Sequence, residues 1–214
     1  MSTLIVVCSK SPNNTLPECV ELLYKIQIDQ NLSMYKMCII DSDSDDFTNY
    51  ETINKNFPEV KIHYVKNKNF EYGAWKYASE LYPDYDNYFC IQDSMLINKP
   101  VDLSVINDKC AYIWKNKSGY TKHMSVKGLG IENLKTTGLN YESVIDTEFT
   151  LAFGNIFIIN NNIMKDIFKT LRTPPVNKEG SCFYERNFGL YFILKNIDTV
   201  DLKDHLTKIN CHRH

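Results

Sequence analysis

A short apolar segment near the middle of the chain ends in an acidic residue. Residues 88–92 read Tyr-Phe-Cys-Ile-Gln and are followed directly by Asp93 and Ser94. A carboxylate held at the end of a strand can bind a hard divalent cation, and such a cation stabilises the negative charge that develops on a leaving diphosphate. Asp93 can equally cap the turn that follows the strand. The local sequence supports both interpretations.

A glycine and a lysine lie close together in a second segment. Residues 69–78 lead into a helical pattern through Gly73, and Lys76 follows about one turn into the helix. Glycine lets the backbone approach a ligand closely, and a helix N-terminus favours an anion. Lys76 would then be available to a phosphate, although Trp75 and Tyr77 are also typical of a tight turn packed into a core.

Residues 41–46 contain a literal Asp-x-Asp pattern. The run Asp-Ser-Asp-Ser-Asp-Asp follows another apolar segment at residues 37–40. It imitates the start of an EF-hand loop, but its sixth position is Asp46, where that loop needs glycine, and its twelfth is Thr52, where the loop needs glutamate. We therefore exclude a calcium loop and interpret most of the run as a solvated turn.

Strands and helices alternate in the first hundred residues. Strands are predicted at residues 4–8, 37–40, 60–65 and 87–92, and helices begin at Pro17 and span about 47–56 and 73–81. This alternation is the signature of βαβ units and a mainly parallel sheet. In an open parallel sheet the ligand crevice lies at the carboxyl ends of the strands. The loops after the first, second and fourth strands are therefore the expected binding loops.

The second half of the chain shows a different sequence pattern. Strands are predicted at residues 111–114, 149–159 and 197–202, the middle one bent near Gly154, and helices at 163–171 and 182–194. Residues 115–146 contain several glycines, many polar residues and little periodicity. This pattern indicates a loop-rich region over the site.

The order of these features resembles the nucleotide-binding half of GT-A glycosyltransferases. The likeness covers residues 3–100 and rests on the strand and polar loop at 6–11, the strand ending in Asp41, the helix start Tyr72-Gly73-Ala74 and the strand end Gln92-Asp93-Ser94. The chain is most similar in character to small transferase domains of capsule and large-virus glycan-assembly systems. The resemblance implies a Rossmann-like α/β fold with a mostly parallel sheet flanked by helices, followed by a loop-rich acceptor half.

The resemblance also implies an activity and a role for each matching residue. The activity is transfer of a hexosyl or deoxyhexosyl group from a nucleoside-diphosphate sugar, with a UDP-sugar favoured, to a glycan hydroxyl. The nucleoside is assigned to Ser9 and Asp41, the nucleoside or phosphates to Tyr72, Gly73 and Lys76, a bound Mn²⁺ or Mg²⁺ to Asp93 with Ser94, and the donor-sugar pocket to Gly154.

One position departs from the family's Asp-x-Asp metal motif. Met95 stands where the second acid is expected, so Asp93 is the only carboxylate of the motif. A late histidine, His205, His212 or His214, can complete the metal shell, as a C-terminal histidine does in some relatives, and His212 is our candidate. Taken alone, each histidine is more typical of a surface residue.

The second half should supply the acceptor site and a catalytic base. An inverting transferase needs a carboxylate that takes the acceptor hydroxyl proton as the oxygen attacks the anomeric carbon. Asp146, Glu148 and Glu185 are the candidates, and Glu185 is preferred because it lies near the start of an otherwise apolar helix, where the family often carries an acid. Glu185 and Arg186 can instead form a buried structural pair.

Composition favours one domain. The chain has 214 residues, 43% of them hydrophobic, which suffices for one core. We expect a single domain over residues 1–214, with a nucleotide-binding half at 1–100 and an acceptor and donor-sugar half at 101–214. This domain can itself be part of a longer polypeptide with further transferase domains.

Charge and apolar runs narrow the choice of partners and compartment. The formal net charge is -2, without a long like-charge block, so nucleic acid is not an expected partner. No apolar run approaches the roughly 20 residues of a membrane span. The 7 cysteines show no zinc spacing and are expected to be reduced, which indicates a cytoplasmic setting.

Two other functions stay open. A sugar nucleotidyltransferase of a related fold needs a glycine-rich basic loop after the first strand, and residues 8–13 contain no glycine. A glycan-binding or nucleotide-binding domain that has lost catalysis is compatible with the lone acid Asp93. A dinucleotide-binding oxidoreductase is disfavoured, because the same loop lacks G-x-G-x-x-G.

Overall fold

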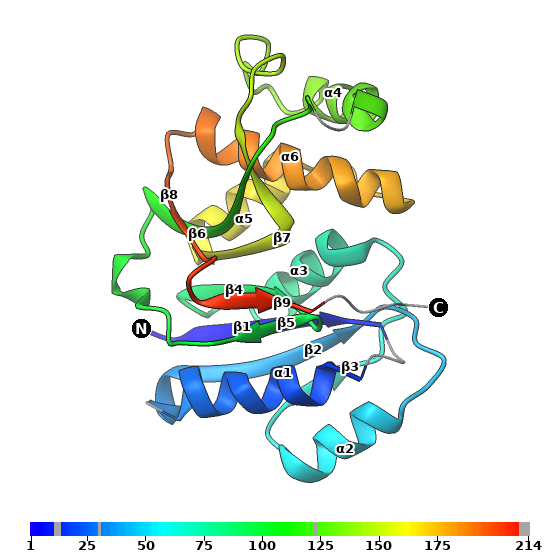
Figure 1. Ribbon diagram of the computed structural model, residues 1–214, viewed down its shortest axis with the longest axis vertical. Coiled ribbons are helices and arrows are strands. Elements are labelled where there is room, and N and C mark those ends of the chain that lie inside the picture. Colours follow the sequence, from blue (N-terminus) through cyan, green and yellow to red (C-terminus); the bar gives the residue numbers. More distant parts are fainter. Residues whose placement is uncertain (11–13, 30, 122–123, 210–214) are drawn as a thin grey trace.

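The computed structural model describes residues 1–10, 14–29, 31–121 and 124–209, which form a layered α/β fold (Figure 1). Within these ranges a seven-stranded sheet has the order β3-β2-β1-β4-β7-β6-β8, and β5 and β9 form a two-stranded sheet. The strands are β1 (Thr3–Ser9), β2 (Tyr35–Asp41), β3 (Lys61–His63), β4 (Asn87–Gln92), β5 (Met95–Ile97), β6 (Cys110–Lys117), β7 (Thr150–Asn160), β8 (Asp198–Asp201) and β9 (Leu206–Lys208).

The α-helices of the described ranges connect and flank these strands. They are α1 (Leu16–Leu22), α2 (Thr48–Asn56), α3 (Phe70–Leu81), α4 (Lys127–Lys135), α5 (Asn161–Thr170) and α6 (Lys178–Leu194). The π-helical segment η1 (Leu23–Ile28) continues α1, and short 3-10 turns lie at η2 (Leu32–Met34), η3 (Leu103–Val105) and η4 (Met124–Val126). Every helix in these ranges is too short or too polar to span a lipid bilayer.

The direction of the strands divides the large sheet into two parts. β1 pairs in parallel with β2 and β4, and β2 pairs in parallel with β3. β7 runs antiparallel to both β4 and β6, whereas β6 and β8 are parallel. The carboxyl ends of β1, β2 and β4 therefore meet at one edge, as the sequence predicts for a ligand crevice.

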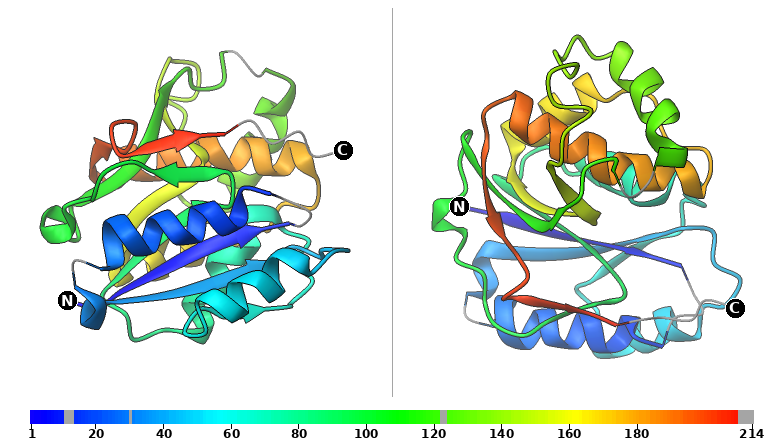
Figure 2. Two further views of the ribbon diagram at one scale, coloured as in Figure 1. Left: turned by 60° about the horizontal axis from the view of Figure 1, so that its bottom comes forward. Right: turned by 45° about the horizontal axis from the view of Figure 1, so that its top comes forward.

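Two apolar layers cover the two faces of the sheet. Along β1, Leu4, Val6 and Cys8 join the core on one face, and Ile5 and Val7 join the core on the other. This is the alternation of a strand buried on both faces. The helices α3, α5 and α6 pack on the first face and α1 and α2 on the second, where β5 and β9 lie beside α1 (Figures 1 and 2).

Most predicted elements are present, but some of their bounds differ, and the helix predicted at 182–194 begins at Lys178. The helix predicted at 73–81 begins earlier, at Phe70, so Glu71 lies in its first turn. The region 115–146, predicted to be loop-rich, contains α4 (Lys127–Lys135). Residues 95–97 and 206–208 form the small sheet, which was not predicted because three-residue strands carry almost no periodicity. In the described part of the chain, the cysteines form no disulfide, and Cys211 lies outside it.

β7 changes its path at Gly154 and Asn155. Both residues are left-handed, with φ of 65° and 56°. The register of β7 with β6 shifts nearby, between Ile113 and Lys115. The bend predicted near Gly154 is therefore present, and it turns two consecutive peptide groups away from the regular ladder.

Helix α6 lies directly on β7 at Gly189. A Cβ atom built at this glycine would lie 2.6 Å from Leu151 Cα and closer still to Thr150 O. No side chain fits at such distances, so glycine allows the close approach of helix and strand. The approach brings the first half of α6, with Ser181 and Glu185, over the bend of β7.

We predict that Gly189→Ala lowers the free energy of unfolding by about 1–3 kcal/mol, because the added methyl group forces α6 away from β7. Urea unfolding followed by circular dichroism measures the loss. Gly128→Ala is the matched control, since Gly128 is exposed in α4 with nothing within 4 Å of a built Cβ. The control should be as stable as the wild type or slightly more stable, because alanine favours the helix. Equal stability of all three proteins would contradict the close contact.

Candidate functional site

A cavity of about 340 Å³ lies at the carboxyl ends of β1, β2 and β4. Residues from these strand ends and from the loop between β3 and α3 line it: Cys8, Ser9, Lys10, Ser42, Asp43, Asn67, Lys68, Phe70, Glu71 and Gln92. The volume lies in the range of small-molecule binding sites. Hydroxyl, amide, ammonium and carboxylate groups all face this space, so the cavity suits a polar ligand.

Charged groups are distributed unevenly around the cavity. Lys10 and Lys68 are exposed at its rim. The Lys68 ammonium lies 3.7 Å from the Asp43 carboxylate; Lys68 is exposed and Asp43 is half-buried. Glu71, by contrast, is 9% exposed. The exposed positive charges therefore lie outside, and the buried negative charge lies inside.

Asp41, predicted to contact a nucleoside, is instead engaged within its own turn. Its carboxylate accepts hydrogen bonds from the backbone N–H groups of Asp43 and Ser44 and, at 2.8 Å, from the hydroxyl of Tyr50. The residue is 2% exposed and is not part of the cavity lining, whereas the neighbouring Ser42 and Asp43 are. Asp41 thus shapes the loop that presents those two side chains.

Asp93, predicted to bind a metal, is fully buried beneath the loop that follows β1. Its Oδ2 accepts a hydrogen bond of 3.1 Å from the backbone N–H of Lys10, and its carbonyl accepts one of 2.8 Å from the Thr15 hydroxyl. Met95, in place of the second acid, is also fully buried. Ser94 is buried too, and its carbonyl accepts from Ile209 N–H.

The described residues near Asp93 do not by themselves form a site for a divalent cation. Among the described residues there is no group of three or more histidine, cysteine, aspartate or glutamate side chains that could hold one. A single carboxylate already bonded to a backbone N–H is a poor substitute for the oxygen-rich shell that Mn²⁺ or Mg²⁺ requires. His205 donates to Pro100 O instead, and His212 and His214 lie outside the described residues.

Tyr72, Gly73 and Lys76 face away from the cavity. The Tyr72 hydroxyl donates to Leu171 O within the core. A Cβ at Gly73 would collide with the Asn67 side-chain oxygen, so this glycine allows tight packing of the loop on α3. Lys76 forms an ion pair with Glu80 on the exposed face of the helix. All three line a separate cleft on the other side of the loop.

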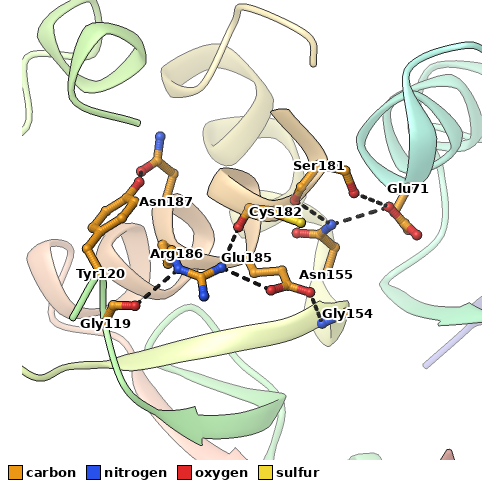
Figure 3. Close-up of polar contacts among 10 residues, drawn as sticks. All are labelled: Glu71, Gly119, Tyr120, Gly154, Asn155, Ser181, Cys182, Glu185, Arg186 and Asn187. Atoms are coloured by element: carbon orange, nitrogen blue, oxygen red, sulfur yellow. Dashed lines mark hydrogen bonds and ion pairs between the residues drawn. The ribbon is translucent and has the colours of Figure 1, made fainter. Parts of the chain in front are cut away.

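Glu185 lies at the bend of β7 and is largely buried (Figure 3). One carboxylate oxygen accepts the backbone N–H of Gly154 at 2.9 Å, and the other lies 3.1 Å from the Arg186 guanidinium. Arg186 is itself held by the carbonyl groups of Gly119 and Cys182. Burial raises the pKa of the Glu185 carboxyl, against the opposing effects of the Gly154 N–H and of Arg186.

The other two predicted bases are exposed. Asp146 forms an ion pair with Lys127 at the surface, and Glu148 is exposed beside it in sequence. None of the three candidates, Glu185 included, lines the cavity. Glu185 is largely buried, and burial raises its pKa, a combination typical of catalytic acids and bases.

A second buried carboxylate, Glu71, was missed at the sequence level. It accepts hydrogen bonds from the side chains of Ser181 at 2.9 Å and Asn155 at 3.3 Å (Figure 3). It also accepts one from the side chain of Gln92 at 2.6 Å. Gln92 and Glu71 line the cavity, and Asn155 is next to Gly154, which contacts Glu185. Glu185 does not itself line the cavity, but it is linked to the lining residue Glu71 through the neighbouring residues Gly154 and Asn155.

Comparison with known proteins gives a structural likeness only. No family model matches the chain, and no curated protein matches it. Solved structures of S. aureus TarS, which is a GT-A glycosyltransferase, do match. One has a TM-score of 0.56 at 12% identity and covers 98% of this chain and 37% of that chain. Another, of TarS residues 1–349 in complex with UDP, has a TM-score of 0.57 at 16% identity and covers 96% of this chain and 60% of that chain.

The coverages show which parts of the two chains are alike. The chain spans between 37% and 60% of the length of the TarS chains that it matches. The likeness nevertheless includes both the parallel strands that end at the cavity and the antiparallel half that carries Glu185, because it extends over almost the whole chain. The protein therefore has a Rossmann-like α/β fold of the GT-A type.

Proposed function

We propose that the chain is a glycosyltransferase that moves a sugar from a nucleoside-diphosphate sugar, with a UDP-sugar favoured, to a glycan hydroxyl. The observation that carries this proposal is the set of contacts that links the polar cavity at the ends of β1 and β4, through Glu71 and the bend of β7, to the largely buried carboxylate Glu185. The GT-A fold and the UDP complex of TarS support it.

The cavity offers the groups that a nucleoside diphosphate needs. Ser9, Ser42 and Asn67 provide hydroxyl and amide groups for the nucleoside, and Phe70 provides an aromatic face for the base. Lys10 and Lys68 lie at the rim, where ammonium groups can pair with phosphate oxygens. These roles replace those that the resemblance assigns to Asp41, Tyr72 and Lys76, whose side chains are engaged elsewhere.

Glu185 serves as the general base in the proposed reaction. The acceptor hydroxyl oxygen forms a bond to the anomeric carbon, and the bond from that carbon to the diphosphate oxygen breaks, leaving its electron pair on the nucleoside diphosphate. Glu185 takes the hydroxyl proton. A carboxylate whose pKa is raised by burial holds that proton more firmly than an exposed one.

A second candidate is a nucleotide-binding domain of the same fold without transferase activity. The replacement of the second acid by Met95 and the burial of Asp93 favour it. The two candidates share the cavity and differ at Glu185, which a binding domain does not need. Hydrolysis of UDP-sugars in the absence of acceptor separates them.

We predict that UDP binds the wild-type chain at least about tenfold more tightly than uridine does, because phosphate oxygens gain charge-assisted bonds from the rim lysines. Isothermal titration calorimetry with UDP, GDP and uridine measures this. Lys68→Met should weaken UDP binding and leave uridine binding unchanged, whereas Lys61→Met, an exposed lysine on β3, should change neither. Absence of UDP binding would overturn the proposed function.

The same titrations in manganese and in chelator decide the role of Asp93. The resemblance predicts a cation at Asp93, whereas the bond from Lys10 N–H predicts a loop anchor. We expect Asp93→Asn to weaken UDP binding equally in both conditions, because Lys10 and the loop are displaced whether or not a cation is present. A loss of UDP affinity in manganese but not in chelator would show that Asp93 binds a cation.

We also predict that Glu185→Gln abolishes sugar transfer and UDP-sugar hydrolysis yet makes the fold more stable at pH 7. When the pKa of a carboxyl group is raised in the folded state, the fold becomes less stable as the pH rises, because the group ionises more easily in the unfolded chain. The gain should disappear below about pH 4, near the ordinary pKa of glutamate, where the wild-type residue is protonated in both states. Thermal unfolding from pH 3 to 8 measures it, and a variant less stable at pH 7 would show that the ion pair with Arg186 dominates.

A further inference from the structure

The buried carboxylate of Glu71 has no part in the mechanism proposed above, yet it joins three elements of the site. Its Oε1 accepts from Gln92 at the end of β4, and its Oε2 accepts from Asn155 on β7 and Ser181 on α6. A carboxylate has room for about four hydrogen bonds. Three of these are used to hold side chains from different parts of the sheet and helix layers.

The charge of Glu71 is costly where it lies. In the described part of the chain no cationic side chain forms an ion pair with it. Its burial is offset by neutral donors alone, although bonds to an ionised acceptor are about twice as strong as neutral ones. Such an arrangement restrains the donor side chains strongly, which is what a precise site requires.

The restraint reaches Glu185 through two neighbouring residues. Asn155 is bonded to Glu71, and the N–H of the adjacent Gly154 is bonded to Glu185 at 2.9 Å. Both residues are left-handed, so their peptide groups depend on outside contacts for their orientation. Gln92, the other partner of Glu71, lies against Gly154, where a Cβ would be 3.5 Å from its side-chain oxygen.

We propose that Glu71 is a positioning residue for the general base: it holds Asn155 and Gln92 so that the Gly154 N–H is directed at Glu185. The proposal rests on the function proposed for Glu185, but the arrangement exists without substrate and can be tested without it. Glu71 acts from the cavity side of the bend in β7, and Glu185 contacts the bend from α6 (Figure 3).

The charge of Glu71 also acts on Glu185 directly. The charged or titratable groups that face Glu185 are Arg186 and Cys182 on α6, Lys208 on β9 and Glu71 on α3. Burial is the main cause of the raised pKa of Glu185, and the carboxylate of Glu71 adds to it. Removal of that charge should therefore lower the pKa of Glu185.

NMR of the chain without ligand tests the proposal. We expect Glu71→Gln to displace the amide resonance of Gly154 and to lower the pKa of Glu185, followed by ¹³C labelling of glutamate carboxyl groups. Glu80→Gln is the matched control, because Glu80 is an exposed glutamate on the same helix and should change neither signal. Wild-type values for both signals in Glu71→Gln would overturn the proposal.

A double variant keeps the test decisive if Glu71→Gln does not fold. The double variant Glu71→Gln with Gln92→Glu exchanges the acid and the amide of the Glu71–Gln92 contact. The amide at position 71 can then donate to position 92 and accept from Ser181 and Asn155. We expect the Gly154 amide to return to its wild-type position. A displaced amide in this folded variant would overturn the positioning role. If the wild type does not bind UDP, the proposed function is wrong, but the NMR result for Glu71 and Gly154 is unaffected.

In an active enzyme the same variants separate positioning from simple stabilisation. Glu71→Gln should lower kcat on the order of a hundredfold with little change in KM, because the base is misplaced while the cavity is kept. The acidic limb of the rate profile should move to lower pH. A loss of stability alone, with kcat and the pH profile unchanged, would contradict the proposal.

Discussion

The close approach of α6 to β7 at Gly189 is the constraint on which the site depends. A helix that rests on backbone atoms of a strand, with no side chain between them, leaves little freedom in their relative position. Ser181 and Glu185 both lie on the part of α6 that precedes this contact, so both are carried onto the bend of β7. The apolar remainder of α6, from Phe188 onward, supplies the core that keeps the helix there.

The bend itself is stabilised by two acids from opposite sides. Gly154 and Asn155 adopt left-handed conformations, which an asparagine does at some cost. Glu185 stabilises the bend by accepting a hydrogen bond from the Gly154 N–H, and Glu71 does so by accepting one from the Asn155 side chain. Each acid accepts a hydrogen bond from one residue of the bend, so the positions of the bend and of the two carboxylates depend on one another.

The fold could be predicted further than the site. The parallel strands, the bend at Gly154 and the long apolar helix α6 follow from periodicity and from glycine, and the order of strand ends pointed to the edge of the sheet where the cavity lies. The partner of a given carboxylate could not be predicted, because it depends on the path of the loops. Asp41 is bonded to Tyr50, nine positions away, and Asp93 to the loop after β1. Glu71 was overlooked because the helix was expected to begin at Gly73, which left this acid in a loop.

The distribution of charge around the cavity favours one orientation of a nucleoside-diphosphate sugar there. Lys68 is paired with the half-buried Asp43 but is itself exposed, so the lysine can exchange this partner for a phosphate at little cost. Glu71 is buried with three hydrogen-bond donors and cannot leave them. A diphosphate is therefore favoured at the lysine rim and disfavoured near Glu71, where hydroxyl groups are the better partners. Under the proposed function, a nucleoside-diphosphate sugar that satisfies both conditions would place its sugar on the side of Glu71 and the bend of β7.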